Sequence, residues 1–342
     1  MSKEIAVIGA GSWGTALASV CAENGHSVTL WVRDERIAKE ISDSRTNKKY
    51  LPDVVLPDTI CAETDLEAAV AGKQVVLLVV PSHAMRSVVR QMAPQLTADT
   101  LLIHAAKGLE IESRKRMSEV IREEVPGEIG DNLVVLTGPS HAEEVVRRSP
   151  TTVVVASESA ERGMQAQDVL MNGYFRVYTN PDLVGAEVAG ALKNIIALGA
   201  GLSDGLGFGD NAKAALLTRG LAEIARLGIK LGANPLTFAG LAGVGDLVVT
   251  CTSKHSRNWR AGYLLGQGEP LQKVLEQMGM VVEGIRTTKA AYSLSREEQV
   301  TMPITHVLHS VLFEGMEARQ GVDELMGRGR TFELEDIMNY PM

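Results

Sequence analysis

The chain has 342 residues and carries 34 Lys and Arg against 42 Asp and Glu, a formal net charge of −8 at pH 7. This acidic balance, without a long basic run, argues against nucleic acid or an anionic membrane as the main partner. Aromatic residues make up 4% of the chain, whereas aliphatic residues and glycine are abundant, which favours an α/β enzyme over an all-β sandwich. At this length one core rarely keeps growing, so we expect two domains.

Cysteine spacing and hydropathy together predict a soluble cytoplasmic protein. Cys21, Cys61 and Cys251 lie far apart without disulfide or metal-type spacing, so we expect reduced cysteines and no metal site. The N-terminus runs directly into an apolar strand, without the hydrophobic core of a signal peptide. Lys193 and Asp246 interrupt the longest apolar stretches, so we expect none of them to span a membrane.

A dinucleotide-binding motif opens the chain. A strand predicted over Glu4–Ile8 runs into Gly9-Ala10-Gly11-Ser12-Trp13-Gly14, and a helix is predicted over Thr15–Asn24. In this order of strand, GxGxxG and helix, the glycines permit a tight turn and close approach of the backbone to a pyrophosphate. The helix N-terminus then presents free N–H groups to the phosphates. The motif therefore predicts that the chain binds NAD(P).

The end of the second strand bears on the choice between NADP and NAD. This strand is predicted over Ser27–Val32, and Arg33 and Asp34 follow it. An acidic residue here would bind the ribose 2′-hydroxyl of NAD, whereas an arginine pairs with the 2′-phosphate of NADP. Arg33 therefore favours NADP(H) over NAD(H). An exposed strand-end arginine without this role is the alternative, and use of NAD stays open.

Further apolar strands alternate with helices, which predicts a parallel sheet covered on both faces. Lys107-Gly108 follows one of these strands, and Gly138-Pro139-Ser140 follows another. Because ligands gather at the carboxyl ends of parallel strands, we expect both segments to line a site, the alternative being ordinary loops. His141 is more simply a solvated loop histidine than a catalytic acid. The strands are expected over 73–80, 100–105, 132–137, 151–156 and 174–178, the last two closing a mixed sheet.

The pattern changes to helices alone after a turn at Thr179-Asn180-Pro181-Asp182. We place the domain boundary there, with a Rossmann-type NAD(P)-binding domain over residues 1–179 and a helical substrate-binding domain over 180–342. The predicted fold class is thus α/β plus all-α, a doubly wound sheet followed by helices. A terminal amphipathic helix is expected over 303–320, for packing or dimer contact, and a polar tail from Gly327 onwards.

The helix predicted over Asp182–Gly201 contains one cation, Lys193, among small and apolar residues. A buried ammonium group needs a partner, and the alternative is a side chain that extends to the surface. Asp246 is an isolated carboxylate in the apolar segment 240–251 and is the economical partner. If it instead caps a helix, the two residues need not meet.

A phosphate-binding segment is predicted further along the chain. Ser256 is a good N-cap for a helix that begins at Arg257 and runs to Leu265. A helix N-terminus with an arginine and polar side chains suits a phosphate, although the same basic residues could form a solvated face. Glu283 follows Val281-Val282 at an expected turn, where a contact to a cofactor amide or a surface role fits.

Together these motifs resemble a known family, the bacterial type of NAD(P)-dependent glycerol-3-phosphate dehydrogenase, and the match covers nearly the whole chain. Beside the GxGxxG, Lys107-Gly108 and Gly138-Pro139-Ser140, the motifs are GALKN at 190–194, GDNAKAALLTRG at 209–220, GLAGVGDLVVTC at 240–251, SRN at 256–258 and VVEG at 281–284. The resemblance implies reversible reduction of dihydroxyacetone phosphate to sn-glycerol 3-phosphate, which feeds phospholipid synthesis. It also implies a cytoplasmic homodimer.

The resemblance assigns roles to individual residues. Lys193 resembles the proton donor and acceptor of the family. The residues that resemble substrate contacts are Lys107, Gly138, Ser140, Lys193, Asp246, Ser256, Arg257 and Asn258. Those that resemble cofactor contacts are Ser12, Trp13, Arg33, Lys107, Ala142, Arg257, Val281 and Glu283, beside the motif glycines Gly9, Gly11 and Gly14.

The expected mechanism is hydride transfer from the nicotinamide to the C2 carbonyl, with Lys193 protonating the developing alkoxide. Burial should lower the pKa of Lys193, while Asp246 opposes this effect and orients the amine. One alternative is a related two-domain dehydrogenase of a hydroxyacyl or sugar-acid substrate, which needs no phosphate anchor. Another is a nucleotide-sensing regulator that binds the cofactor without turnover.

Overall fold

The computed structural model describes residues 2–279, 281–330 and 333. The chain divides into two compact units. Unit 1 comprises Met1–Ala106 and Met117–Leu183, and unit 2 comprises Lys107–Arg116 and Val184–Met342. The segment Lys107–Arg116 therefore belongs to unit 2, although its chain neighbours on both sides belong to unit 1.

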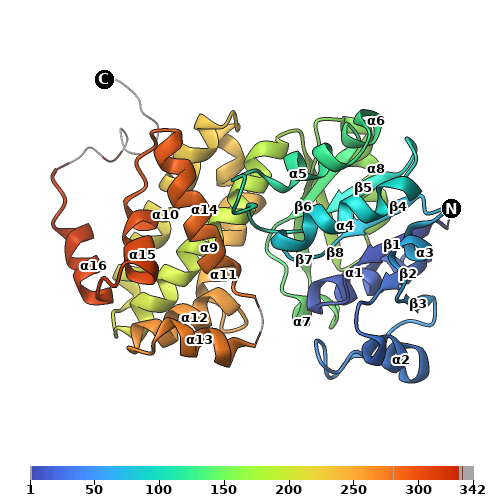
Figure 1. Cartoon of the computed structure of the whole chain (residues 1–342), viewed down its shortest axis with the longest axis horizontal. Helices are drawn as coiled ribbons and strands as arrows, with labels where there is room; N and C mark the ends of the chain where they lie inside the picture. Colours follow the sequence, from blue (N-terminus) through green and yellow to red (C-terminus); the bar gives the residue numbers. More distant parts are fainter. Residues whose placement is uncertain (1, 280, 331–332, 334–342) are drawn as a thin grey trace. The chain divides into compact units, whose positions relative to one another are not determined.

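Unit 1 is built on an eight-stranded sheet in the order β3-β2-β1-β4-β5-β6-β7-β8 (Figure 1). Neighbouring strands pair in parallel, except that β6 and β7 are antiparallel. The predicted mixed sheet is therefore confirmed. The strands are β1 Glu4–Ile8, β2 Ser27–Trp31, β3 Ile60–Glu63, β4 Val75–Leu78, β5 Leu101–His104, β6 Leu133–Thr137, β7 Thr151–Ala156 and β8 Phe175–Asn180.

Helices cover both faces of this sheet, as in a doubly wound fold (Figure 1). Ile5 and Val7 of β1 enter one apolar core, and Ala6 and Ile8 enter the other, because successive side chains of a strand point to opposite faces. The helices of unit 1 are α1 Ser12–Glu23, α2 Glu35–Ser44, α3 Leu66–Val70, α4 Met85–Met92, α5 Met117–Glu124, α6 Gly127–Gly130, α7 Ala142–Val145 and α8 Ala160–Leu170.

Unit 2 is helical, which confirms the predicted fold class. Two short helices, η3 Pro235–Ala239 and the π-helical turn η4 Leu241–Gly245, precede the segment that contains Asp246. The α-helices are α9 Leu183–Gly205, α10 Asp210–Lys230, α11 Asp246–Thr252, α12 Arg257–Gly266, α13 Leu271–Met278, α14 Glu283–Glu297, α15 Pro303–Phe313 and α16 Ala318–Met326.

The single terminal helix expected over 303–320 is wrong. The structure has two helices there, because α15 ends at Phe313 and α16 begins at Ala318. Gly315 between them has φ +75°, a left-handed conformation that glycine adopts readily and that ends a helix. Most of the tail expected from Gly327 onwards lies outside the described residues.

Helices α9 and α12 approach each other through glycines. A Cβ at Gly201 of α9 would lie 1.9 Å from the carbonyl oxygen of Trp259, and a Cβ at Gly262 of α12 would lie 1.9 Å from that of Leu198. Residues with a side chain cannot occupy these positions without moving the backbones apart. The crossing therefore brings the start of α12 close to the middle of α9.

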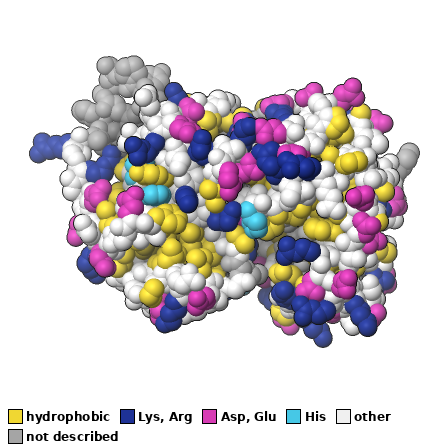
Figure 2. All heavy atoms as spheres, in the orientation of Figure 1, with side chains coloured by type: hydrophobic (Ala, Val, Ile, Leu, Met, Phe, Trp, Pro, Cys, Tyr) yellow, Lys and Arg dark blue, Asp and Glu magenta, His cyan; other side chains and the backbone are white. Residues whose placement is uncertain are grey.

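Helix α9 corrects the expectation that every apolar stretch is too interrupted to span a membrane. By length and composition α9 qualifies, with a mean hydropathy of 1.4 over its best window, but 94% of that window is buried inside the protein. Burial of this kind is what the core helix of a folded domain shows. Cys21 and Cys251 are buried, Cys61 is exposed, and all three are free, as expected. Basic and acidic side chains are interspersed on the face drawn in Figure 2.

Candidate active site

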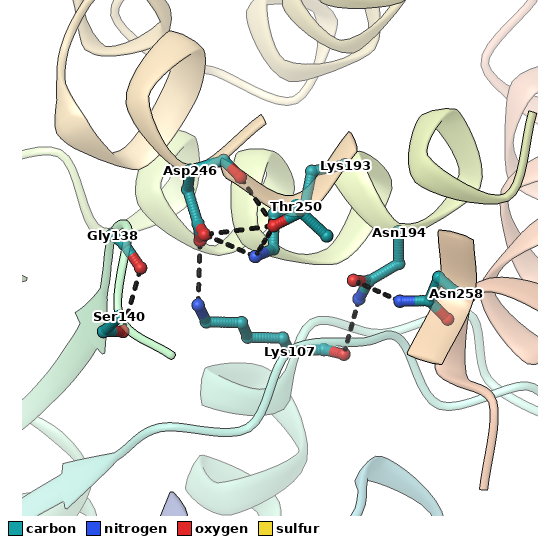
Figure 3. Close-up of polar contacts among 8 residues, drawn as sticks. All are labelled: Lys107, Gly138, Ser140, Lys193, Asn194, Asp246, Thr250 and Asn258. Carbon is teal, nitrogen blue, oxygen red and sulfur yellow. Dashed lines mark hydrogen bonds and ion pairs between the residues drawn. The ribbon is translucent and has the colours of Figure 1, made fainter. Parts of the chain in front are cut away.

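Two lysine side chains of unit 2 meet on the carboxylate of Asp246 (Figure 3). Lys193 Nζ, from α9, contacts Asp246 Oδ1 at the start of α11. Lys107 Nζ donates a hydrogen bond to the other carboxylate oxygen, Oδ2, over 2.8 Å. Asp246 is 1% exposed and Lys193 5% exposed, so the pair is buried. The predicted partnership of Lys193 with Asp246 is confirmed, and the surface-directed lysine is not observed.

Thr250 completes the surroundings of the Lys193 amine. Lys193 Nζ donates to Thr250 Oγ1 over 2.7 Å, and the Thr250 hydroxyl donates to the carbonyl oxygen of Asp246 over 2.6 Å. Thr250 and Asp246 lie four residues apart on α11, so both side chains fall on the same face of that helix. Thr250 was not predicted as a site residue, although its i, i+4 spacing from Asp246 could have revealed it.

The titration of the cluster follows from burial and from the shared carboxylate. Burial lowers the pKa of Lys193 to about 7, the charge of Asp246 opposes this effect, and the nearby charge of Lys107 adds to it. Burial alone would raise the pKa of Asp246, but the two lysines lower it below its ordinary value. With two ammonium groups on one carboxylate, the fully charged cluster has a net positive charge, which suits an anionic ligand.

A chain of amide hydrogen bonds joins this cluster to α12 and α14. Asn194 Nδ2 donates to the carbonyl oxygen of Lys107 over 3.4 Å, and Asn258 Nδ2 donates to Asn194 Oδ1 over 2.8 Å (Figure 3). Asn258 Oδ1 in turn accepts from the backbone N–H of Gly284 over 2.8 Å. Asn258 was predicted as a site residue, whereas Asn194 was not, despite standing next to Lys193.

The predicted phosphate-binding segment has the expected local structure. Ser256 caps α12, its hydroxyl accepting from the Trp259 N–H over 3.2 Å. Arg257 is the first residue of α12, is exposed, and donates to the carbonyl oxygen of Val281 over 3.3 Å. Two predicted cofactor contacts, Arg257 and Val281, are thus neighbours within unit 2. Glu283 starts helix α14 rather than standing in a turn, which corrects that expectation.

In unit 1 the glycines of the GxGxxG motif have the geometry that a dinucleotide requires. Gly9 has φ +116°, and a Cβ there would lie 2.8 Å from the carbonyl oxygen of Val79. A Cβ at Gly14 would lie 1.8 Å from the Gly9 carbonyl oxygen, whereas one at Gly11 would meet nothing within 4 Å. Gly9 and Gly14 are therefore required for packing, and Gly11 leaves open space beside the N-terminus of α1. This space fits a pyrophosphate.

Helix α1 also offers unused donors at this end. Gly11 is its N-cap and makes no side-chain capping bond. Among the described residues, the buried indole Nε1 of Trp13 has no hydrogen-bond partner. The Ser12 hydroxyl donates to the carbonyl oxygen of Tyr50 over 3.0 Å. A helix N-terminus with free N–H groups and no acidic residue in its first turn suits an anion, so these residues fit the phosphates of NAD(P).

The residues after β2 differ in their availability. Arg33 is exposed. Asp34 is the N-cap of α2: its Oδ1 accepts from the Arg36 backbone N–H over 3.0 Å, and its carboxylate forms an ion pair with the Arg36 guanidinium. The carboxylate that could serve a ribose 2′-hydroxyl is thus already engaged, whereas the guanidinium of Arg33 is accessible.

The other predicted contacts in unit 1 lie beyond β6. Gly138 has φ +119°, and the Ser140 hydroxyl donates to its carbonyl oxygen over 3.0 Å. His141 is the N-cap of α7, and Ala142 is the first residue of that short helix. Gly138 and Ser140 follow the carboxyl end of β6, as predicted.

Comparisons with known proteins identify the family from these same segments. The model for the NAD-dependent glycerol-3-phosphate dehydrogenase N-terminus matches residues 4–163, and the model for the C-terminus of that family matches residues 182–323. The chain belongs to this family. The suspected resemblance is therefore confirmed.

Individual relatives agree with the assignment. The chain is 61% identical over 338 residues to glycerol-3-phosphate dehydrogenase [NAD(P)+] of Geobacillus thermodenitrificans, covering 98% of both chains. It is 55% identical over 337 residues to the Bacillus subtilis enzyme of the same name, again covering 98% of both. The crystal structure of glycerol-3-phosphate dehydrogenase from Coxiella burnetii matches 96% of this chain and 99% of its own, with a TM-score of 0.91 and 39% identity.

Within this family fold, the two units divide the predicted site residues between them. Unit 2 brings together the substrate-binding candidates Lys107, Lys193, Asp246, Ser256, Arg257 and Asn258. Unit 1 holds the motif glycines with Ser12 and Trp13, together with Arg33, Gly138, Ser140 and Ala142. Lys107 belongs to unit 2, although in the sequence it follows a strand of unit 1.

Proposed function

We propose that this protein catalyses the reversible NAD(P)H-dependent reduction of dihydroxyacetone phosphate to sn-glycerol 3-phosphate. Membership of the glycerol-3-phosphate dehydrogenase family supports this function. The observation that carries the mechanism is the buried Lys193 amine on the Asp246 carboxylate, with Lys107 on the other carboxylate oxygen. An amine whose pKa lies near neutrality can both give and take a proton at physiological pH.

Lys193 is the proposed proton donor and acceptor. In the direction of reduction its ammonium group donates a proton to the oxygen that develops negative charge at C2 of the substrate. In the reverse direction its neutral amine removes the hydroxyl proton. Asp246 and Thr250 hold the amine in one orientation, since each contacts Nζ. The bound nicotinamide cofactor supplies or accepts the hydride.

Lys107 and the start of α12 are proposed to bind the charged parts of the substrate. The Lys107 side chain is 21% exposed and adds positive charge next to Lys193, which stabilises charge on the substrate oxygens. Arg257 and the N-terminus of α12 at Ser256 offer a guanidinium and free N–H groups to the phosphate. Asn258 holds its place through Asn194. Gly138 and Ser140 of unit 1 stay predicted substrate contacts.

In unit 1 we propose that the motif glycines, Ser12, Trp13 and Ala142 contact the cofactor. The proposed cofactor contacts of unit 2 are Val281, Glu283, Lys107 and Arg257. Either NADP or NAD fits the family. We propose that NADP(H) is preferred, because Arg33 is exposed after β2 whereas Asp34 is engaged with Arg36.

Replacement of Lys193 by alanine tests the function. We expect the variant to lose oxidation of NADPH on addition of dihydroxyacetone phosphate, while its affinity for NADPH, measured by fluorescence titration, stays that of the native protein. Lys213→Met is a matched control, since Lys213 pairs with Asp204 over 2.9 Å elsewhere in unit 2. Retained turnover in Lys193→Ala would refute the assigned role.

We also propose that the protein is a cytoplasmic homodimer whose product supplies phospholipid synthesis. The family relationship supports this context, since sn-glycerol 3-phosphate carries the glycerol backbone and phosphate that a glycerophospholipid requires. Light scattering coupled to size-exclusion chromatography tests the dimer: a mass equal to one chain would contradict it.

A further inference from the structure

The segment that carries Lys107 is a closed loop. Leu109 and Arg116 pair as an isolated antiparallel bridge, and the backbone N–H of Glu110 donates to the carbonyl oxygen of Lys115 over 3.0 Å. Leu109 is also buried, with 4% of its surface exposed. The two ends of the segment Lys107–Arg116, called the lysine loop from here on, are therefore tied to each other. We therefore expect a displacement of Arg116 to displace Lys107 as well.

Both ends of the lysine loop are fastened to the rest of unit 2. At one end Lys107 contacts Asp246, and its carbonyl oxygen accepts from Asn194 over 3.4 Å. At the other end Arg116 Nη1 donates to Glu187 Oε2 over 2.7 Å. The contact to Asn194 is long, so the ion pair at the far end is a stronger attachment than this hydrogen bond.

The Arg116–Glu187 pair is suited to this task by its burial and by its place on α9. The side chain of Arg116 is 13% exposed and that of Glu187 is 4% exposed, so water screens their attraction little. A second pair on the loop, Arg114 with Glu297, is 33% and 51% exposed and therefore holds the loop weakly. Glu187 lies on the same helix as Lys193, six positions earlier. One rigid helix thus holds both the anchor of the loop and the proposed proton donor.

We propose that Arg116 and Glu187 are positioning residues for the reaction: their ion pair fixes the lysine loop on α9 and so holds Lys107 on Asp246, beside Lys193. The inference rests on the proposed function and adds to it a pair that touches neither substrate nor cofactor. Without the pair, Lys107 moves away from Asp246, and the carboxylate is left to Lys193 alone. Both the alignment of Lys107 and the proton affinity of Lys193 then change.

The experiment compares the native protein with Arg116→Met, Glu187→Gln and the double variant. Removing one partner of a buried ion pair leaves the other charge unpaired, whereas the double variant leaves no unpaired charge. The double variant is therefore expected to fold even if a single variant does not. In the double variant we expect kcat for dihydroxyacetone phosphate to fall about ten- to a hundredfold, with KM for NADPH unchanged. The midpoint of the pH profile of kcat/KM should move to higher pH, because Lys107 no longer opposes the protonation of Lys193.

A merely structural role would lower thermal stability without moving the pH profile. Arg116→Lys keeps the charge at shorter reach and is expected to recover part of kcat. Lys213→Met is the matched control, because it breaks a pair between α9 and α10 that does not involve the lysine loop. A folded double variant with native kcat and a native pH midpoint would overturn the proposal.

Amide hydrogen exchange of residues 107–116, read by mass spectrometry, separates this inference from the proposed function. We expect faster exchange in this loop in the double variant and none of that change in Lys213→Met. Unchanged exchange would refute the anchoring whether or not the protein turns over its substrate. Accelerated exchange in a protein whose native form does not oxidise NADPH would support the anchoring and contradict the proposed function instead.

Discussion

Replacing Asp246 with asparagine tests the electrostatic design of the site. The change preserves shape but leaves Lys107 and Lys193 close together without the carboxylate that both contact. Loss of one partner from a buried ion pair costs about 3–5 kcal/mol, and each unit of pKa corresponds to about 1.4 kcal/mol. Since the Asp246 charge is what opposes burial at Lys193, we expect the pKa of Lys193 to fall by about two units.

The assay is kcat/KM for dihydroxyacetone phosphate as a function of pH, which reports the free enzyme. Reduction needs the protonated amine, so kcat/KM of the native protein should fall as pH rises through the Lys193 pKa of about 7. In Asp246→Asn this midpoint should move to lower pH. At pH 7 about half of the native amines are protonated, whereas a pKa two units lower leaves about one in a hundred protonated, so kcat/KM should drop about fiftyfold.

Asp204→Asn is the matched control, because Asp204 is also an aspartate of unit 2 that pairs with a lysine, Lys213, over 2.9 Å. It should leave the pH midpoint where it is. If Asp246→Asn keeps the native midpoint and loses less than about threefold in kcat/KM, then the carboxylate does not set the proton affinity of Lys193, and the reasoning fails.

Three further predictions concern other parts of the chain. Burial raises the pKa of Glu223 to about 7 from 4.5, so the stability that its protonated form contributes is complete below about pH 4.5 and falls by about 3 kcal/mol as pH rises from there to about 7. Glu223→Gln should flatten that part of the curve of melting temperature against pH. Arg33→Ala should raise KM for NADPH about ten- to a hundredfold and leave KM for NADH unchanged; equal effects on both would exclude a 2′-phosphate contact. Gly262→Ala places a Cβ 1.9 Å from the Leu198 carbonyl oxygen and should cost about 3 kcal/mol of unfolding free energy in denaturant titration, so a native midpoint would show that the helices can separate at no cost.

Local patterns in the sequence were sufficient for much of the fold. The apolar runs predicted seven of the eight strands within a few residues, because both faces of the sheet are buried. The short strand β3, Ile60–Glu63, was not predicted. The capping rule placed the start of α12 at Ser256. The rule failed after α15, where Gly315 in a left-handed conformation divides a run that is apolar enough for one helix. Hydrophobic periodicity alone does not reveal a single residue whose backbone conformation ends the helix.

The site was predictable where chemistry demanded a partner and unpredictable where only the fold brings residues together. Lys193 and Asp246 could be paired because each is an isolated charge among apolar residues. Arg116 and Glu187 are 71 positions apart, and Arg116 stands beside other cations, Arg114 and Lys115, so nothing in the local sequence singles it out as the partner of Glu187. Thr250 lies between these cases, since its spacing from Asp246 was visible but its contact with the amine required α9 and α11 to pack.

The role proposed for Lys193 requires one amine that can both donate and accept a proton, and Asp246 and Lys107 both act on its pKa. On the apolar helix α9, burial lowers the pKa of Lys193 and the charge of Asp246 opposes this effect. Lys107 shares the carboxylate and acts in the same direction as burial, and the net pKa is about 7. It follows that Asp246→Asn and Lys107→Met should move the pH midpoint in opposite directions, down for the first and up for the second. A shift of the same sign in both variants would contradict this balance.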